Sequence, residues 1–193
     1  MYGRRWIAWL AVTVLGLALA PVRNVVADEV EVPPALQVQL LDRVLRYERG
    51  YASERDPVRV LVVVRPGGAE SERTGAQLRA AITHAGTLGG RPVVVTQHGF
   101  RGVARLVRRA QRREASVVYL SAGLGGEVPR LVQAMPSPGR VVVSSVGADA
   151  DGGATLAFEL ESSRPRIVVN LASAATQQLQ FSAQLLRVSR VVR

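Results

Sequence analysis

Cysteine and lysine are both absent from this sequence of 193 residues. Without cysteine the chain has no disulfide, no thiol nucleophile, no thiolate metal ligand and no N-terminal cysteine to carry a lipid. An exported domain of this size can fold on its hydrophobic core alone, so the absence does not argue against secretion. Without lysine the chain also lacks the phosphate-binding loop that ends in Gly-Lys-Ser/Thr.

Histidine is scarce as well, which limits catalytic and metal chemistry. His84 and His98 are the only two, and they are not spaced like zinc ligands. The sequence has no G-x-S-x-G motif, which would present a serine nucleophile between a strand and a helix. We interpret both histidines as surface residues and predict no catalytic residue, no metal site and no cofactor. An exported hydrolase, with a Ser/His/Asp arrangement assembled from distant segments, is the least favoured function.

Only one apolar run is long, and it lies near the N-terminus. Residues 6–20 carry no charge and follow two arginines, but the run is shorter than the ~20 residues of a membrane-spanning helix. The side chains of Val25-Val26-Ala27 fit a cleavage site. We therefore predict that residues 1–27 are a cleaved signal peptide for export to the periplasm, and that residues 28–193 form one domain. The alternative is an uncleaved membrane anchor.

Acidic residues are few, so the chain is strongly cationic. It has 25 arginines against 15 aspartates and glutamates, a net charge of +10. Three arginines lie within the predicted signal peptide, so the remaining domain has 22 cations against 15 acids, or +7. After export we expect no nucleic acid as a partner. Anionic surfaces, polyanions and acidic protein faces are the partners that such a charge attracts.

The spacing of apolar residues predicts alternating helices and strands. Helices are predicted over residues 35–51, 69–85, 101–113, 127–135 and 172–192. Strands are predicted over residues 58–64, 92–96, 116–120, 140–145, 155–160 and 166–171. The first four strands alternate with helices, which is typical of a parallel sheet, whereas the last two follow each other closely. We predict an α/β three-layer sandwich with a mainly parallel sheet, a C-terminal antiparallel hairpin and a closing helix.

Two glycine-rich segments resemble ligand-binding loops without completing the pattern. Residues 123–126 (GLGG) lie between a predicted strand and helix, but Val128 occupies the last glycine position of G-x-G-x-x-G, and Glu127 would repel phosphate. We interpret this segment as a tight turn rather than a nucleotide site. Residues 148–153 (ADADGG) begin like a calcium loop, but the further oxygen ligands of such a loop do not follow. We interpret them as a solvated turn.

An arginine stripe on the predicted helix 101–113 is the sharpest local signal. At ~100° per residue, four arginines fall within about 60° of one another. They are Arg101, Arg105, Arg108 and Arg112. Apolar residues fall on the opposite side of the helix, namely Val103, Leu106, Val107 and Ala110. Arg109 and Arg113 widen the cationic face, which has no acid before Glu114.

Solvated faces usually mix charges of both signs, and this face carries only one sign. We predict that the four arginines bind an acidic partner face or an anionic envelope polymer; the alternative is an ordinary solvated face.

The C-terminal part of the chain carries a family likeness. In residues 152–187, Gly152-Gly153 precede a strand, a second strand ends in Asn170-Leu171, and a segment containing Leu185-Leu186 follows. This pattern resembles the C-terminal signature of the YfiR family of periplasmic proteins. The predicted signal peptide and the VVYL strand at residues 117–120 fit the same family. The resemblance gives the two glycines and Asn170 structural roles, with the asparagine capping the final helix.

The resemblance implies regulation rather than catalysis. The best-known members are dimeric periplasmic inhibitors of a membrane-anchored diguanylate cyclase, and they respond to envelope signals through an outer-membrane lipoprotein. We therefore expect a non-enzymatic exported protein that binds and represses such a cyclase. Characterised members carry disulfides that tune this response, and because this chain has no cysteine we do not expect redox control. The alternative is a periplasmic solute- or polyanion-binding module that uses the loops at the carboxyl ends of the strands.

Overall fold

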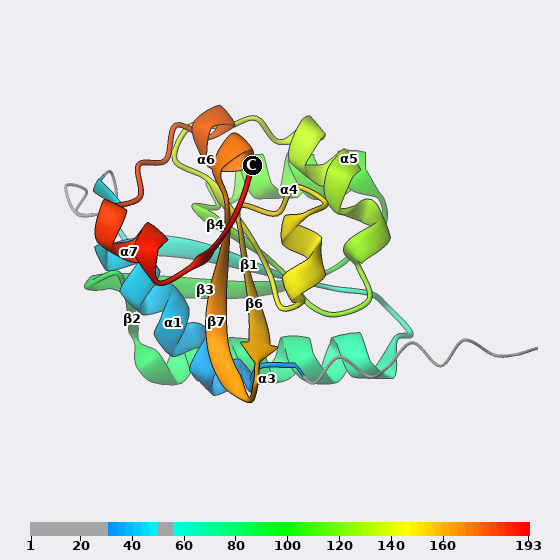
Figure 1. Cartoon of the computed structure of the whole chain (residues 1–193). Helices are drawn as coiled ribbons and strands as arrows, with labels where there is room; N and C mark the ends of the chain where they lie inside the picture. The colour runs from blue at the N-terminus through cyan, green and yellow to red at the C-terminus, as the bar shows by residue number, and fades with distance from the viewer. Residues whose placement is uncertain (1–30, 50–55) are drawn as a thin grey trace, which may run out of the picture.

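The structure is a computed structural model, and it describes residues 31–49 and 56–193 of the chain. In this part of the chain an eight-stranded sheet has the order β2-β3-β1-β4-β5-β6-β7-β8. Its strands β6 and β7 lie side by side in Figure 1. The strands are β1 (Val58–Val64), β2 (Thr87–Leu88), β3 (Arg91–Gly99), β4 (Val117–Leu120), β5 (Val141–Ser144), β6 (Leu156–Glu161), β7 (Arg164–Asn170) and β8 (Arg190–Val192). Neighbours are parallel except for β2–β3 and β6–β7. The predicted mainly parallel sheet with an antiparallel C-terminal hairpin is confirmed.

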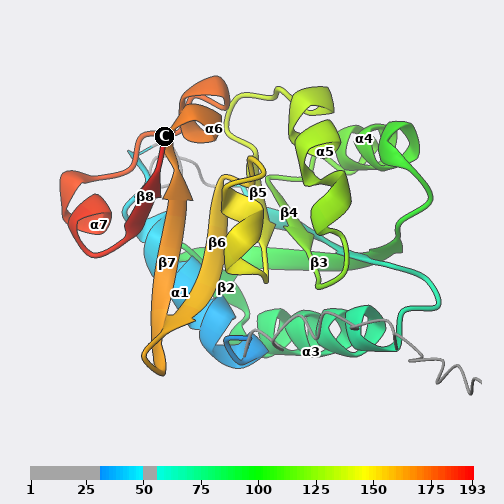
Figure 2. The same cartoon turned by 45° about the vertical axis from the view of Figure 1, so that its right-hand side comes forward.

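Helices cover both faces of the sheet and form the outer layers. They are α1 (Pro34–Arg46), α3 (Ala69–Ala85), α4 (Val103–Arg112), α5 (Val128–Ala134), α6 (Leu171–Thr176) and α7 (Ala183–Arg187), with the 3-10 turns η1 (Gly125–Glu127) and η2 (Gly147–Ala150). In Figure 2, β3 lies between α3 on one side and α4 and α5 on the other. The predicted three-layer arrangement is therefore present.

Strand β1 lies between β3 and β4 in the parallel part of the sheet and contributes side chains to both cores. Its even-numbered valines, such as Val60 and Val62, pack in the core beneath α1 and α3. Leu61 and Val63 face the second core, beneath α4 and α5. A strand buried on both faces needs an apolar side chain at nearly every position, and the sequence VRVLVVV provides one. The predicted bounds of this strand, residues 58–64, match the structure.

Helix α3 also has its predicted bounds, residues 69–85, and the sequence explains both its packing and its end. Gly75 faces β1 so closely that an added Cβ would lie 2.1 Å from Cγ1 of Val64. A larger residue there would force the helix away from the sheet. The helix stops at Gly86, which adopts a left-handed conformation (φ 67°) and donates its N–H to the carbonyl of Ile82.

The hairpin β6–β7 is tighter than the sequence suggested. Glu161 pairs with Arg164, so only Ser162 and Ser163 form the turn. Both serines have positive φ angles, 49° and 64°. A two-residue turn with two positive φ angles is the type that matches the twist of the flanking strands. As a result β7 begins at Arg164, two residues before the predicted strand at 166–171.

The continuous closing helix predicted over residues 172–192 is wrong. Asn170 caps α6 as expected, since its Oδ1 accepts the N–H of Ser173 at 2.8 Å. The helix then ends at Thr176, Gln178 takes a positive φ of 56°, and a second short helix, α7, begins after Ser182. The chain finally becomes strand β8, parallel to β7.

The intervening segment is held away from helical geometry by contacts with the end of α1. The buried carboxylate of Glu48 accepts the N–H of Gln180 at 2.8 Å, and Glu48 and Phe181 form a bridge between the two backbones. Phe181 packs against the core beneath α1. These contacts join residues more than 130 positions apart, so a periodic pattern within the segment could not reveal them.

Several predictions concern residues outside the described ranges. The predicted signal peptide, residues 1–27, lies wholly outside them, as do the last residues of the helix predicted over 35–51. The described part of that helix, α1, ends at Arg46. Among the described residues, no helix combines the length and apolar character needed to span a bilayer.

Candidate anion-binding groove

A groove of about 680 Å³ lies at the carboxyl ends of β1 and β3, beside α4. We call it the arginine groove. It is lined by Val64, Pro66, Glu72, His98, Gly99, Arg101, Arg105, Arg108, Arg109 and Arg112. Its volume is within the range of small-molecule sites.

The topology of the sheet explains why a groove forms at this point. β1 continues into α3 on one face, whereas β3, its parallel neighbour, continues into α4 on the opposite face. The two connections therefore diverge, and a crevice remains between the carboxyl ends of the strands. Open α/β sheets hold their ligands in such crevices.

All four arginines of the predicted stripe line this one groove. Arg105, Arg108 and Arg112 lie on α4 and are exposed. Arg101 is also exposed but lies ahead of the helix, because α4 begins at Val103 rather than at residue 101. Arg109 joins them and is half-buried. The opposite side of α4 is anchored as expected.

The anchoring residues of α4 pack into the second core. Leu106 and Ala110 are fully buried there, and Val103 and Val107 pack against the same cluster. The helix is thus fixed by its apolar side, and its orientation presents the arginines to the groove. The apolar residues and the arginines of α4 thus lie on opposite sides of the helix, as the sequence predicts.

The charge in the groove is almost entirely of one sign. Within the described residues, no ion pair joins any of the five arginines to an acidic side chain. The carboxylate that lines the groove is that of Glu72, and its Oε1 accepts the N–H of Gly67 at 3.0 Å. Five guanidinium groups around one carboxylate repel one another, and a bound anion would relieve that repulsion.

His98 lies at the carboxyl end of β3 and faces the same arginines. Its Nε2 is buried and has no hydrogen-bond partner within the described chain, and the same is true of Nε of Arg109. Burial, together with the positive charges of Arg109 and Arg101, lowers the pKa of His98. The imidazole is therefore neutral at pH 7, which limits the repulsion in the free groove. Our interpretation of His98 as a simple surface residue missed this position, because the pairing of β3 with β1 brings it to the groove.

The GLGG segment is a βα turn, as predicted, and packs internally. Nε of Arg65 donates to the carbonyl of Gly123 at 2.7 Å. A Cβ on Gly125 would lie 2.5 Å from Oδ1 of Asp149, so the glycine is needed for this close approach. A carboxylate at this distance from the loop disfavours a phosphate there.

The interpretation of residues 148–153 as a solvated turn is wrong for Asp149. This side chain is buried, and its Oδ2 accepts the hydroxyl of Ser144, the last residue of β5, at 2.5 Å. Its backbone N–H donates to Val146 and its carbonyl accepts from Ala154, so the segment forms the 3-10 turn η2 and its exit. No group of three potential metal-ligating side chains occurs in the part of the chain described.

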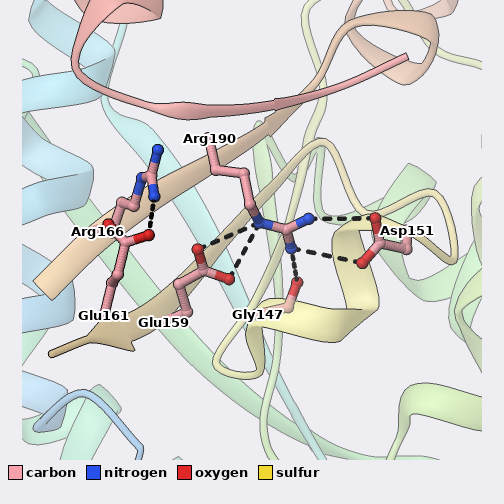
Figure 3. Close-up of polar contacts among 6 residues, drawn as sticks. All are labelled: Gly147, Asp151, Glu159, Glu161, Arg166 and Arg190. Carbon is pink, nitrogen blue, oxygen red and sulfur yellow. Dashed lines mark hydrogen bonds and ion pairs between the residues drawn. The ribbon is translucent and has the colours of Figure 1, made fainter.

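Asp151, in contrast, is at the surface and belongs to a cluster centred on Arg190 (Figure 3). Nε of Arg190 lies 3.2 and 3.1 Å from the two carboxylate oxygens of Glu159. Its terminal nitrogens reach Asp151 at 3.3 and 3.4 Å and the carbonyl of Gly147 at 3.4 Å. Burial alone would lower the pKa of Arg190, but the hydrogen bonds and charges of Asp151 and Glu159 outweigh it and raise the pKa. One side chain thus ties β8 to β6 and η2.

Replacing Arg190 by glutamine is expected to destabilise the protein by about 1–2 kcal/mol, because hydrogen bonds to charged groups are worth about 1.5–3 kcal/mol and solvent screens this half-buried cluster. Urea denaturation measures the change, and hydrogen exchange of the β8 amides shows whether this strand opens first. Arg164→Gln, at an exposed position in the same hairpin, is the control. Equal exchange of β8 in both variants would contradict the assigned role.

The fold and the groove define the class of protein as a three-layer α/β domain with an open crevice at the carboxyl ends of two parallel strands. The chain belongs to the YfiR/HmsC-like family, whose pattern it matches over residues 37–190. This is a family of periplasmic regulators rather than enzymes, and its members act through a partner signalling protein. The resemblance seen in residues 152–187 is therefore confirmed.

Solved structures show the same fold at low sequence identity. The chain is similar to a conserved domain protein from Vibrio cholerae (TM-score 0.62, 13% identity, 83% of this chain and 60% of that one). It is also similar to an ABC domain in complex with L-Trp from Streptococcus pneumoniae (0.61, 11%, 83% and 62%). A third is CD0873 from Clostridium difficile, described as a substrate binding protein with adhesive properties (0.59, 10%, 81% and 58%). The chain thus spans about three-fifths of these proteins. A comparison with curated proteins gives no match.

Proposed function

We propose that the protein is an exported repressor that binds the periplasmic part of a membrane-anchored diguanylate cyclase. The observation that carries the proposal is the match to the YfiR/HmsC-like family over residues 37–190. Cleavage after Ala27 would release the domain into the periplasm, where it would meet the cyclase. A homodimer and an outer-membrane lipoprotein that relieves repression remain predictions from the same family.

The arginine groove supports a contact with an acidic face of the partner. Arg105, Arg108 and Arg112 project from one side of a helix whose other side is fixed in the core. Arginine suits such an interface because its planar group pairs bidentately with carboxylates. Since none of these three arginines forms an ion pair within the described part of the chain, a partner carboxylate would not have to displace an existing one.

Two measurements test the repressor function directly. The protein is used as bait in envelope extracts, and cyclic-di-GMP is measured in a strain that lacks the gene. We expect capture of a membrane protein with a cyclase domain and a rise in cyclic-di-GMP, because the repressor has been removed. Complementation with the unaltered chain should restore the original level. Capture of no signalling protein, together with unchanged cyclic-di-GMP, would reject the proposal.

A further inference from the structure

The arginine groove has the features of a site for a soluble ligand, besides those of a protein contact surface. It is an open groove of about 680 Å³, and two buried nitrogens of its lining residues have no hydrogen-bond partner within the described chain. Buried polar groups in folded proteins nearly always have a partner. His98 and Arg109 both line the groove, and each holds one buried nitrogen, Nε2 and Nε respectively, that no group of the described chain satisfies.

The spacing of the cations indicates the shape of that ligand. Arg105 and Arg112 are separated by seven positions on α4, and a helix rises ~1.5 Å per residue, so these two arginines lie roughly 10 Å apart along the helix axis. Arg108 lies between them, and Arg101 extends the row ahead of the helix. A single carboxylate or orthophosphate would meet only one or two of these groups, whereas an elongated anion with several charges would meet most of them.

We propose that the arginine groove binds a soluble, linear solute that carries several phosphate groups. Phosphate oxygens match the bidentate geometry of arginine, and each group carries more charge than a carboxylate. The positive end of the α4 dipole, near Val103, adds to the attraction. The site lies at the carboxyl ends of β1 and β3, where the connections to α3 and α4 diverge. This inference concerns the isolated protein and does not depend on a cyclase being the partner.

The test is isothermal titration of the purified full protein with sodium tripolyphosphate at 150 mM salt. We expect one molecule bound per chain, and at least a tenfold loss of affinity in the double variant Arg105→Gln/Arg109→Gln, because two charge-assisted hydrogen bonds are removed. Arg43→Gln/Arg79→Gln removes the same charge from exposed positions outside the groove and should bind within about twofold of the unaltered protein.

Because Arg109 is half-buried, the double variant could lose binding by misfolding, so a second variant leaves this residue in place. His98→Gln keeps every arginine and should weaken binding about threefold, which is less than the double variant does. No binding at millimolar tripolyphosphate, or an equal loss in the control variant, would overturn the proposal. Binding to vesicles of phosphatidylglycerol without binding to tripolyphosphate would assign the groove to a membrane surface and would also overturn it.

Discussion

Replacing Arg101, Arg105, Arg108 and Arg112 together by glutamine is expected to weaken binding of the signalling partner by roughly 30-fold. Exposed ion pairs contribute about 0–1 kcal/mol each, so four of them sum to about 2 kcal/mol. The salt dependence of binding should flatten in the variant, because the charges that salt screens are gone. The free energy of unfolding should change by less than about 1 kcal/mol, since these four side chains are exposed and make no ion pair within the described chain.

The control for this variant must remove the same charge elsewhere. Arg43, Arg79, Arg130 and Arg187 are exposed and lie outside the groove. Replacing these four by glutamine lowers the net charge equally, so a loss caused only by long-range attraction would appear in both variants. Binding that is unchanged in affinity and in salt slope when the groove arginines are replaced would mean that the stripe is an ordinary solvated face.

Replacing Leu106 by alanine is expected to destabilise the protein by about 2–5 kcal/mol. Leu106 is fully buried beneath α4, and removing its branched end leaves a cavity that the surrounding side chains fill only in part. The residue also sets the orientation of the helix, and with it the position of the arginines on the other side. Urea denaturation gives the free energy, and α4 amide exchange shows whether the helix has loosened.

Arg108→Ala, two positions along the same helix, is the matched control. It truncates a longer side chain at an exposed position, so it should cost about 0.5 kcal/mol or less. The pair of variants separates the structural side of α4 from the side that faces the groove. A cost below about 1 kcal/mol for Leu106→Ala would show that α4 is not anchored through this residue.

Elements whose sequence pattern is local were predictable. β1 and α3 have the predicted ranges, because a nearly continuous apolar run rich in β-branched residues defines the first, and the turn at residues 66–68 precedes the second. The apolar and cationic sides of α4 followed from helical spacing alone. In each case the determining interactions lie within the element or immediately beside it.

Features that depend on distant contacts were not predictable. His98 lines the groove because β3 pairs with β1 and α4 packs on the face of the sheet opposite α3, an arrangement that the spacing of residues within one segment does not reveal. Asp149 is buried because it packs against Gly125, more than twenty residues away. The closing segment is divided by contacts with Glu48 and not by any helix-breaking residue of its own.

The shortness of β2 has a consequence for self-association. β2 pairs only with Arg91 and Pro92, and Gly86 accepts the N–H of Val93, so in the described chain the outer edge of β3 has no neighbouring strand beyond Val93. Unpaired edges recruit the strands of other copies, which is how many sheet proteins begin to aggregate. Here the arginine groove lies beside the same strand, so two copies approaching edge to edge would bring their cationic faces together. Repulsion between the two sets of arginines would keep the strand edges apart. Concentrated salt would screen this repulsion, so association through the edges is expected to be strongest there.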